Sequence, residues 1–191
     1  MRQEELWDGL YGSTQRVWRG NARVPDPTSG DALDIGCGNG KTASSLLDMG
    51  YRVTGIDFSS VAVGSCRELF GGSAKFEVAS ATDLPFPDGS FDYVTCVHVL
   101  EHLTDEEVSA AAGEMHRVLR PGGYVFVRSF TKDDMRSAKR AEGEIRYVYR
   151  EPDGMCALFA GFDAVSSGRV EETTRFGALR SRTECLFRRV P

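Results

Sequence analysis

Short runs of apolar residues alternate with longer amphipathic stretches along most of this chain. A short apolar run bounded by glycine, proline or aspartate is typical of a buried strand, and apolar residues recurring every three or four positions are typical of a helix. The runs predict strands at residues 32–35, 51–56, 75–79, 91–97 and 124–127. The amphipathic stretches predict helices at residues 41–49, 59–70 and 104–119.

The order of these elements defines a fold class. Residues 91–97 form a largely apolar run that suits burial on both faces of a sheet, which indicates parallel strands. Parallel neighbours need crossover helices, and Ser59 and Thr104 are suitable N-cap residues for two of them, the second with Glu107 in a capping box. The pattern therefore predicts an α/β protein with a Rossmann-like, doubly wound, mostly parallel sheet.

The two ends of the chain have less regular patterns. Near the start, residues 1–29 open with a helix-like stretch that Pro25 and Pro27 end. The last third predicts mixed helix and loop at 131–144, an added strand at 145–149, a short helix at 152–159, and two last strands at 162–170 and 183–190 joined through Gly177.

Composition narrows the classes of function. The 191 residues suit one domain, and the net charge of −5 disfavours nucleic acid as a partner because nucleic-acid-binding domains usually carry a basic face. The sequence has no apolar run long enough to span a bilayer, and its charged start does not resemble a signal peptide, so we expect a cytoplasmic protein without membrane contact. The five cysteines lie singly, a spacing that predicts neither a metal site nor disulfides.

A glycine-rich loop follows the first predicted strand. In an open α/β sheet the ligand lies beyond the carboxyl ends of the strands, and Gly36, Gly38 and Gly40 allow a tight turn and a close approach of backbone to ligand there. Asp57 ends the second strand about 20 residues later, where a carboxylate accepts the hydroxyl protons of a ribose. Glycines also serve packing, and Asp57 is also suited to the start of the helix after Ser59. Together the loop and the carboxylate predict an adenosine-containing ligand.

These residues carry a resemblance to a known family. Residues 33–40, Leu-Asp-Ile-Gly-Cys-Gly-Asn-Gly, resemble the first motif of class I S-adenosylmethionine-dependent methyltransferases of the methyltransferase type 11 and ubiquinone–menaquinone biosynthesis group. Dinucleotide dehydrogenases place their glycines as G-x-G-x-x-G instead. Further matching segments follow in order at residues 55–59, 83–92, 98–103 and 117–123. The resemblance covers about residues 30–130 and implies a seven-stranded sheet with an antiparallel last strand.

The resemblance implies a cofactor site for S-adenosylmethionine, with S-adenosylhomocysteine as product. Asp34 would lie near the methionine ammonium or order the loop, and the ribose would lie on Asp57. The remaining implied cofactor-binding residues are Gly36, Cys37, Gly38, Gly40, Phe58, Ser80, Ala81, Thr82, Val97 and His98. The chain departs from the family pattern after its third strand, where Ser80 stands in place of an acidic residue. The resemblance also divides the single domain, residues 1–191, into a helical lid at 1–29, a cofactor-binding core at 30–130 and a substrate-side segment at 131–191.

Two histidines are candidates for catalysis. An imidazole at His98 or His102 can remove a proton from an acceptor near neutral pH, although the family motif around His102, which does not depend on the acceptor, favours a structural role for that residue. With Glu101 they do not make a convincing metal site. The candidates for an acceptor pocket are Tyr11, Trp18, Arg19, Tyr147, Tyr149 and Arg150.

The function that these features predict is methyl transfer to a small-molecule acceptor. Three alternatives stay open: a non-catalytic S-adenosylmethionine-binding or interaction protein, a methyltransferase acting on protein or RNA, and a nicotinamide-dependent oxidoreductase. The glycine spacing disfavours the last, and the acidic charge disfavours RNA.

Overall fold

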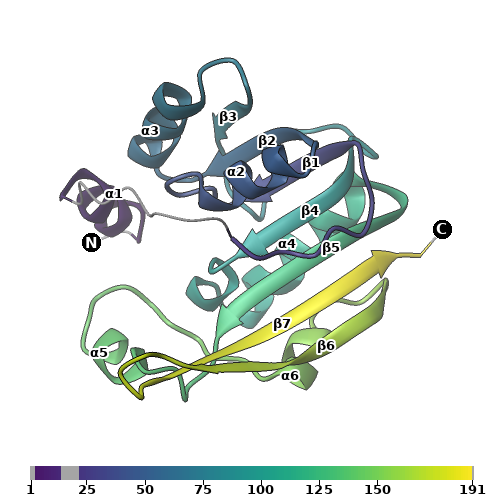
Figure 1. The fold of residues 1–191 in the computed structure, drawn as a ribbon. Helices are drawn as coiled ribbons and strands as arrows, with labels where there is room; N and C mark the ends of the chain where they lie inside the picture. Colours follow the sequence, from purple (N-terminus) through teal and green to yellow (C-terminus); the bar gives the residue numbers. More distant parts are fainter. Residues whose placement is uncertain (1–2, 14–21, 191) are drawn as a thin grey trace.

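A seven-stranded sheet forms the centre of the structure (Figure 1), a computed structural model that describes residues 3–13 and 22–190. The spatial order of its strands is β3-β2-β1-β4-β5-β7-β6. Their bounds are Asp31–Ile35 (β1), Arg52–Asp57 (β2), Lys75–Val78 (β3), Phe91–Val97 (β4), Leu119–Phe130 (β5), Phe162–Thr173 (β6) and Leu179–Arg189 (β7). Strands β1 to β5 are parallel and β7 is antiparallel to both of its neighbours, which confirms the predicted fold class.

Helices connect the parallel strands where the amphipathic stretches predict them. The bounds are Gln3–Ser13 (α1), Lys41–Asp48 (α2), Ser60–Phe70 (α3), Asp105–Val118 (α4), Ser137–Ala141 (α5) and Pro152–Ala157 (α6), with a 3-10 turn, η1, at Leu100–His102. Ser59 caps α3 by accepting from the Ala62 amide, and Thr104 and Glu107 form the predicted capping box of α4. Local chemistry therefore decides where these two helices begin.

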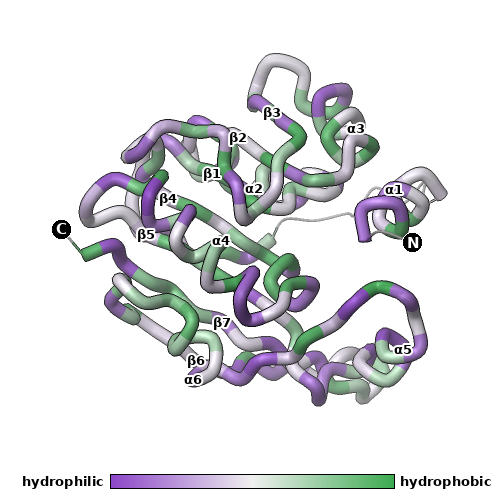
Figure 2. The backbone as a smooth tube through the Cα atoms, turned by 180° about the vertical axis from the view of Figure 1, so that it is seen from behind, coloured by the Kyte–Doolittle hydropathy of each residue, from purple (hydrophilic) through white to green (hydrophobic). Residues whose placement is uncertain are grey.

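Hydrophobic residues pack on both faces of the sheet. One cluster joins Leu33 and Ile35 of β1 to α4 and α6, and the other joins Ala32 of the same strand to α2 and α3. Figure 2 shows largely hydrophobic colours along the central strands. Because successive side chains of a strand point to opposite faces, one short strand contributes to both clusters. Strand β4, buried at Tyr93, Val94, Thr95 and Cys96, does the same.

The strand order reverses at β1. Strands β2 and β3 lie on one side of β1, and β4 and β5 lie on the other. The loops that follow β1 and β4 therefore diverge and leave room for a ligand, as at the switch point of other doubly wound sheets. We call the edge at which β1, β2, β3 and β4 end the carboxyl edge.

The last third of the chain differs from the prediction in one element. Residues 145–149 form no strand, so that prediction is wrong: the Val148 amide donates to the Glu101 carbonyl at 2.7 Å, and the segment crosses η1 instead of joining the sheet. The long β6–β7 hairpin occupies the position beside β5. The alternation of residues 145–149 thus reflects packing onto a turn. The helix predicted at 152–159 and the two last strands are confirmed as α6, β6 and β7.

Helix α1 lies beyond the carboxyl edge, beside α3 (Figure 1). Its Asp8 carboxylate accepts a hydrogen bond from the Ser59 hydroxyl, and its Gln3 accepts from the Arg146 amide at 3.1 Å. The candidate pocket residues Trp18 and Arg19 lie outside the described residues. None of the described helices is long and apolar enough to cross a membrane.

Candidate functional site

The glycine loop after β1 adopts a backbone that favours glycine. Gly36, Gly38 and Gly40 have φ values of 69°, 49° and 78°, in the left-handed region that other residues rarely adopt. A Cβ on Gly36 would overlap the Val99 side chain, and one on Gly38 would lie 2.8 Å from the Tyr11 hydroxyl. The loop therefore leaves no room for side chains at these positions.

Asp57 connects the end of β2 to this loop. Its side chain is buried, and its two carboxylate oxygens accept from the Gly38 amide and the Ser59 amide, each at 2.9 Å. Burial raises the pKa of this carboxyl above its usual value. The bond to Ser59 is the helix-start role open to this residue, and the bond to Gly38 adds a second role, in which Asp57 orders the loop. Each oxygen keeps a further lone pair for a ligand hydroxyl.

Asp34 lies one residue before the end of β1 and is almost fully buried. One of its oxygens accepts from the Thr95 hydroxyl at 2.9 Å, while Oδ2 has no hydrogen-bond partner among the described residues. Burial raises the pKa of this carboxyl to about 7. A buried carboxylate oxygen without a partner is costly unless a cationic or donor ligand meets it.

We expect substitution of Asp34 by asparagine to change how stability depends on pH. The folded carboxyl, with its raised pKa, keeps its proton between about pH 4 and pH 7 while the unfolded carboxyl loses it, so this group stabilises the fold at low pH and loses that contribution as pH rises to about 7. Asparagine carries no proton to lose. Relative to the natural chain, the variant is expected to gain roughly 1 to 3 kcal/mol, or several degrees in Tm, between pH 5 and pH 8.5.

Thermal unfolding of the ligand-free protein at these two pH values measures the change. The matched control is Asp153→Asn, because Asp153 is exposed in the first turn of α6. A Tm difference between variant and natural chain that is the same at pH 5 and pH 8.5 would show that Asp34 ionises normally in the fold.

The turn after β3 brings together the three residues predicted to lie on the adenine side. The hydroxyls of Ser80 and Thr82 are 2.8 Å apart, and the Thr82 amide donates to the Ser80 hydroxyl at 3.2 Å. Ala81 is half-buried between them. Neutral hydroxyls thus occupy the turn in which the family pattern has a carboxylate. Phe58, at the end of β2, is also half-buried and lies on the same edge.

His98 follows Val97 at the end of β4 and has an unusual backbone. Its φ is 62°, the only positive value at a non-glycine residue in the described part of the chain. Its Nδ1 lies 3.0 Å from Glu101 Oε1, and its ring stacks on Phe130 with 3.8 Å between centroids. Such a backbone is held by its surroundings and is common at functional sites. The Nδ1 contact leaves Nε2 available to a ligand.

The contact between Glu101 and His98 was not predicted from the sequence. The Glu101 side chain is fully buried, and its Oε2 has no hydrogen-bond partner among the residues described. Burial opposes its ionisation, but the hydrogen bond from His98 and the charges of His98 and His102 prevail and lower the pKa of the carboxyl. The spacing of three residues between His98 and Glu101 was the available signal, since that spacing places side chains together in a tight turn.

His102 has surroundings of a different kind. Its Nδ1 lies 2.8 Å from the Arg146 carbonyl, and its ring packs edge-on against Trp7 of α1 and Tyr147, with centroids 4.9 and 4.7 Å away. Burial lowers the pKa of the imidazole. These contacts join α1 to the segment after α5, so packing alone accounts for the position of His102.

Tyr11 and Arg150, two candidates for the acceptor pocket, have different surroundings. Tyr11 lies over Gly38, and burial raises the pKa of its hydroxyl. Arg150 instead donates to the carbonyls of Leu100 and Leu103, both at 2.7 Å, and to the Asp105 carboxylate. Arg150 therefore supports η1 and the start of α4.

The carboxylates of the carboxyl edge suit a cationic ligand. Asp34, Asp57 and Glu101 are all buried there, and two of them have a carboxylate oxygen without a partner among the residues described. S-adenosylmethionine carries an ammonium and a sulfonium, whereas the pyrophosphate of a nicotinamide dinucleotide would bring further negative charge. The residues present fit S-adenosylmethionine.

Comparison with known proteins identifies the family. Residues 33–127 match the family model described as a methyltransferase domain, and they include the glycine loop, Asp57 and His98. The chain belongs to the class I S-adenosylmethionine-dependent methyltransferases. Within that class its relatives include enzymes named for quinone biosynthesis. S-adenosylmethionine is the cofactor of the family.

Two curated relatives illustrate the similarity. The chain is 40% identical over 122 residues to a 2-methyl-6-phytyl-1,4-hydroquinone methyltransferase of Synechocystis, a match that covers 62% of this chain and 37% of that protein. It is 39% identical over 105 residues to a ubiquinone biosynthesis O-methyltransferase of Aromatoleum aromaticum, with coverage of 53% and 44%. The chain therefore spans less than half the length of these two relatives.

Solved structures share the fold. A methyltransferase from Methanosarcina mazei superposes with a TM-score of 0.69 at 26% identity, covering 84% of this chain and 92% of that one. A structure concerned with the conversion of a disulfide bond into a thioacetal group during echinomycin biosynthesis gives a TM-score of 0.71 at 29% identity, covering 84% and 76%.

Proposed function

We propose that this chain transfers the methyl group of S-adenosylmethionine to a small-molecule acceptor. The observation that carries the proposal is the arrangement at the carboxyl edge, where a glycine loop ordered by Asp57 lies beside the buried Asp34 with its unpaired oxygen. This arrangement combines a hydroxyl-accepting carboxylate, a close backbone approach and a partner for a cation. S-adenosylmethionine, when bound, supplies an electrophilic methyl group on a positively charged sulfur.

The residues of the chain then have separate tasks. Asp57 accepts the ribose hydroxyls and holds the Gly38 amide, and Asp34 meets the ammonium. His98, which directly follows β4, takes a proton from the acceptor at Nε2 while Glu101 holds Nδ1 and stabilises the resulting imidazolium. His102 holds the lid by packing between Trp7 and Tyr147. Alignment of the reactants supplies most of the catalysis, because the sulfonium is already activated.

The N-terminal helix serves as a lid in this proposal. Tyr11 covers the glycine loop, Asp8 bonds to Ser59, and Trp7 packs on His102. A helix held at these points excludes water from the carboxyl edge when it is closed, and it must move to admit the cofactor. The proposal keeps the expected division into a lid at 1–29, a cofactor-binding core at 30–130 and a substrate-side segment at 131–191.

The names of the relatives support a small acceptor. The two curated relatives described above are named for a hydroquinone and for ubiquinone biosynthesis. The net charge of −5 disfavours RNA as the acceptor, because RNA-binding domains usually carry a broad basic face. A small molecule is therefore preferred over a nucleic acid as the acceptor.

Parallel calorimetric titrations with S-adenosylmethionine, S-adenosylhomocysteine and NAD test the proposal. We expect micromolar binding of the first two and none of NAD. A radiolabelled methyl-transfer assay with a panel of hydroquinones and catechols, with and without an anionic substituent, run beside bulk RNA and denatured protein, then tests the acceptor class. Binding of NAD alone would overturn the cofactor, cofactor binding without any transfer would favour a non-catalytic binding protein, and labelling of only RNA or protein would overturn the acceptor class.

A further inference from the structure

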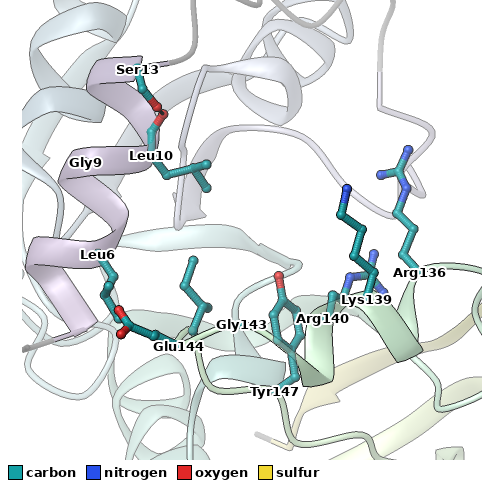
Figure 3. Close-up of a pocket in the computed structure, with 11 residues that line it drawn as sticks. Leu6, Gly9, Leu10, Ser13, Arg136, Lys139, Arg140, Gly143, Glu144 and Tyr147 are labelled. Atoms are coloured by element: carbon teal, nitrogen blue, oxygen red, sulfur yellow. Dashed lines mark hydrogen bonds between the residues drawn. The ribbon is translucent and has the colours of Figure 1, made fainter.

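A cavity of about 700 Å³ lies between α1 and the segment that contains α5. Figure 3 shows α1 on one side of this cavity, α5 on the other, and the Tyr147 hydroxyl pointing into the space between them. A volume of this size is usual for a small-molecule site. We call it the α1–α5 pocket, and its lining residues are Leu6, Gly9, Leu10, Ser13, Arg136, Lys139, Arg140, Gly143, Glu144, Ile145 and Tyr147.

The two sides of the α1–α5 pocket differ in chemistry. Leu6 and Leu10 of α1 give one side an apolar character, whereas Arg136, Lys139 and Arg140 come from the α5 side (Figure 3). The single acidic lining residue, Glu144, lies near Leu6 in this view, away from Lys139. Figure 2 likewise shows hydrophilic colours around α5. The pocket thus has an apolar half and a cationic half in a chain whose net charge is negative.

Two of the three cations are available to a ligand. Arg140 is held by an ion pair with Asp134, 3.0 Å from Oδ1, and its guanidinium lies 3.5 Å from the centre of the Phe130 ring. Neither Arg136 nor Lys139 forms an ion pair with an acidic residue in the described part of the chain, and both are exposed. Their charges can therefore meet an anionic group without first breaking an ion pair.

The α1–α5 pocket lies beside the site of methyl transfer. The Phe130 ring stacks on His98, the proposed base, and also contacts the guanidinium of Arg140, a lining residue of the pocket. One ring therefore connects the pocket wall to the proposed base. Tyr147, another lining residue, packs against His102. The α1–α5 pocket therefore borders the residues that pack on His98 and His102.

We propose that the α1–α5 pocket binds the methyl acceptor and selects an amphipathic molecule that carries an anionic group. The apolar body lies against Leu6, Leu10 and Tyr147, and the anion lies against Arg136 and Lys139. This inference rests on the proposed function, which it deepens by naming the chemical class of the acceptor. The neutral hydroquinone in the name of one relative is a different class.

A matched pair of fluorescent probes tests the inference without methyl transfer. Anilinonaphthalene sulfonate and the uncharged phenylnaphthylamine share an apolar body and differ in the anionic group. We expect the full chain, saturated with S-adenosylhomocysteine, to bind the sulfonate at least about 10-fold more tightly, with an affinity that falls as salt rises. The double variant Arg136→Glu with Lys139→Glu is expected to remove this preference and leave binding of the uncharged probe unchanged.

Two further variants locate the site. Leu10→Asp, on the apolar side, is expected to weaken binding of both probes. The control Lys75→Glu with Arg188→Glu makes the same change in net charge at exposed positions at the opposite edge of the sheet, and is expected to change neither affinity. Equal binding of the two probes, or equal loss of sulfonate binding in the two charge-reversed proteins, would overturn the inference. Calorimetry with S-adenosylhomocysteine on the same proteins measures the cofactor site separately. Absence of probe selectivity in the natural chain with intact binding of S-adenosylhomocysteine would contradict only the pocket inference, whereas absence of S-adenosylhomocysteine binding in the natural chain would contradict the proposed function.

Discussion

Replacement of Asp57 by alanine is expected to weaken binding of S-adenosylmethionine by about 1.5 to 3 kcal/mol, on the order of 10- to 100-fold in Kd. The carboxylate serves the ligand twice in the proposed site, once by accepting ribose hydroxyls and once by holding the Gly38 amide at 2.9 Å. Removing it withdraws the first interaction and frees the glycine loop. Calorimetric titration of the variant and the natural chain measures the difference.

The same substitution is expected to lower the free energy of unfolding. It leaves the Gly38 and Ser59 amides without their acceptor in a buried position, at a cost of about 1 to 3 kcal/mol. Asp57→Asn retains one acceptor oxygen and is expected to fall between the natural chain and the alanine variant in both stability and affinity. Asp153→Ala, at an exposed site in α6, controls for the loss of a carboxylate. A folded alanine variant with unchanged affinity would remove Asp57 from the ribose role.

Strands β1 to β4 could be predicted from the sequence to within one residue at each end, whereas β5 is much longer than the predicted 124–127. Strand β4 spans Phe91–Val97 as predicted, because a strand buried on both faces is largely apolar. The starts of α3 and α4 could also be predicted, since Ser59 and Thr104 satisfy backbone amides locally. The loop glycines followed from the same local logic. The structural role of a residue could therefore be predicted where its interactions are with neighbours in sequence.

Features that depend on distant contacts could not be predicted in this way. Residues 145–149 have the alternation of a strand, but their amide at Val148 bonds to the Glu101 carbonyl, far away in sequence. The position of α1 depends on Gln3 and Arg146, which are 143 residues apart. The left-handed backbone at His98 is indicated by no hydrophobic period, although the spacing of three residues to Glu101 was a local signal for their contact. In the proposed site, the glycine loop and Asp57 were therefore more predictable than the surroundings of His98 and α1, which depend on tertiary contacts.

Substitution of His98 by asparagine is expected to lower kcat by about 100-fold or more, if the imidazole serves as the general base for the acceptor. Asparagine tolerates the left-handed backbone that His98 adopts at φ 62°, so the turn after β4 should persist while the proton acceptor is lost. The KM for S-adenosylmethionine is expected to change little. Steady-state kinetics with an acceptor found in the panel above, together with calorimetry on the same protein, measures both quantities.

Glu101→Gln separates catalysis from packing at this position. Glutamine keeps an oxygen within reach of His98 Nδ1, 3.0 Å from the natural carboxylate, but it removes the charge that stabilises an imidazolium. We expect kcat to fall by about 10-fold with both KM values unchanged. His102→Asn is the comparison, because His102 packs between Trp7 and Tyr147 and its loss should loosen the lid, raising KM more than it lowers kcat. Full turnover in the His98 variant would assign catalysis to alignment alone and leave the His98–Glu101 contact a structural role in the turn.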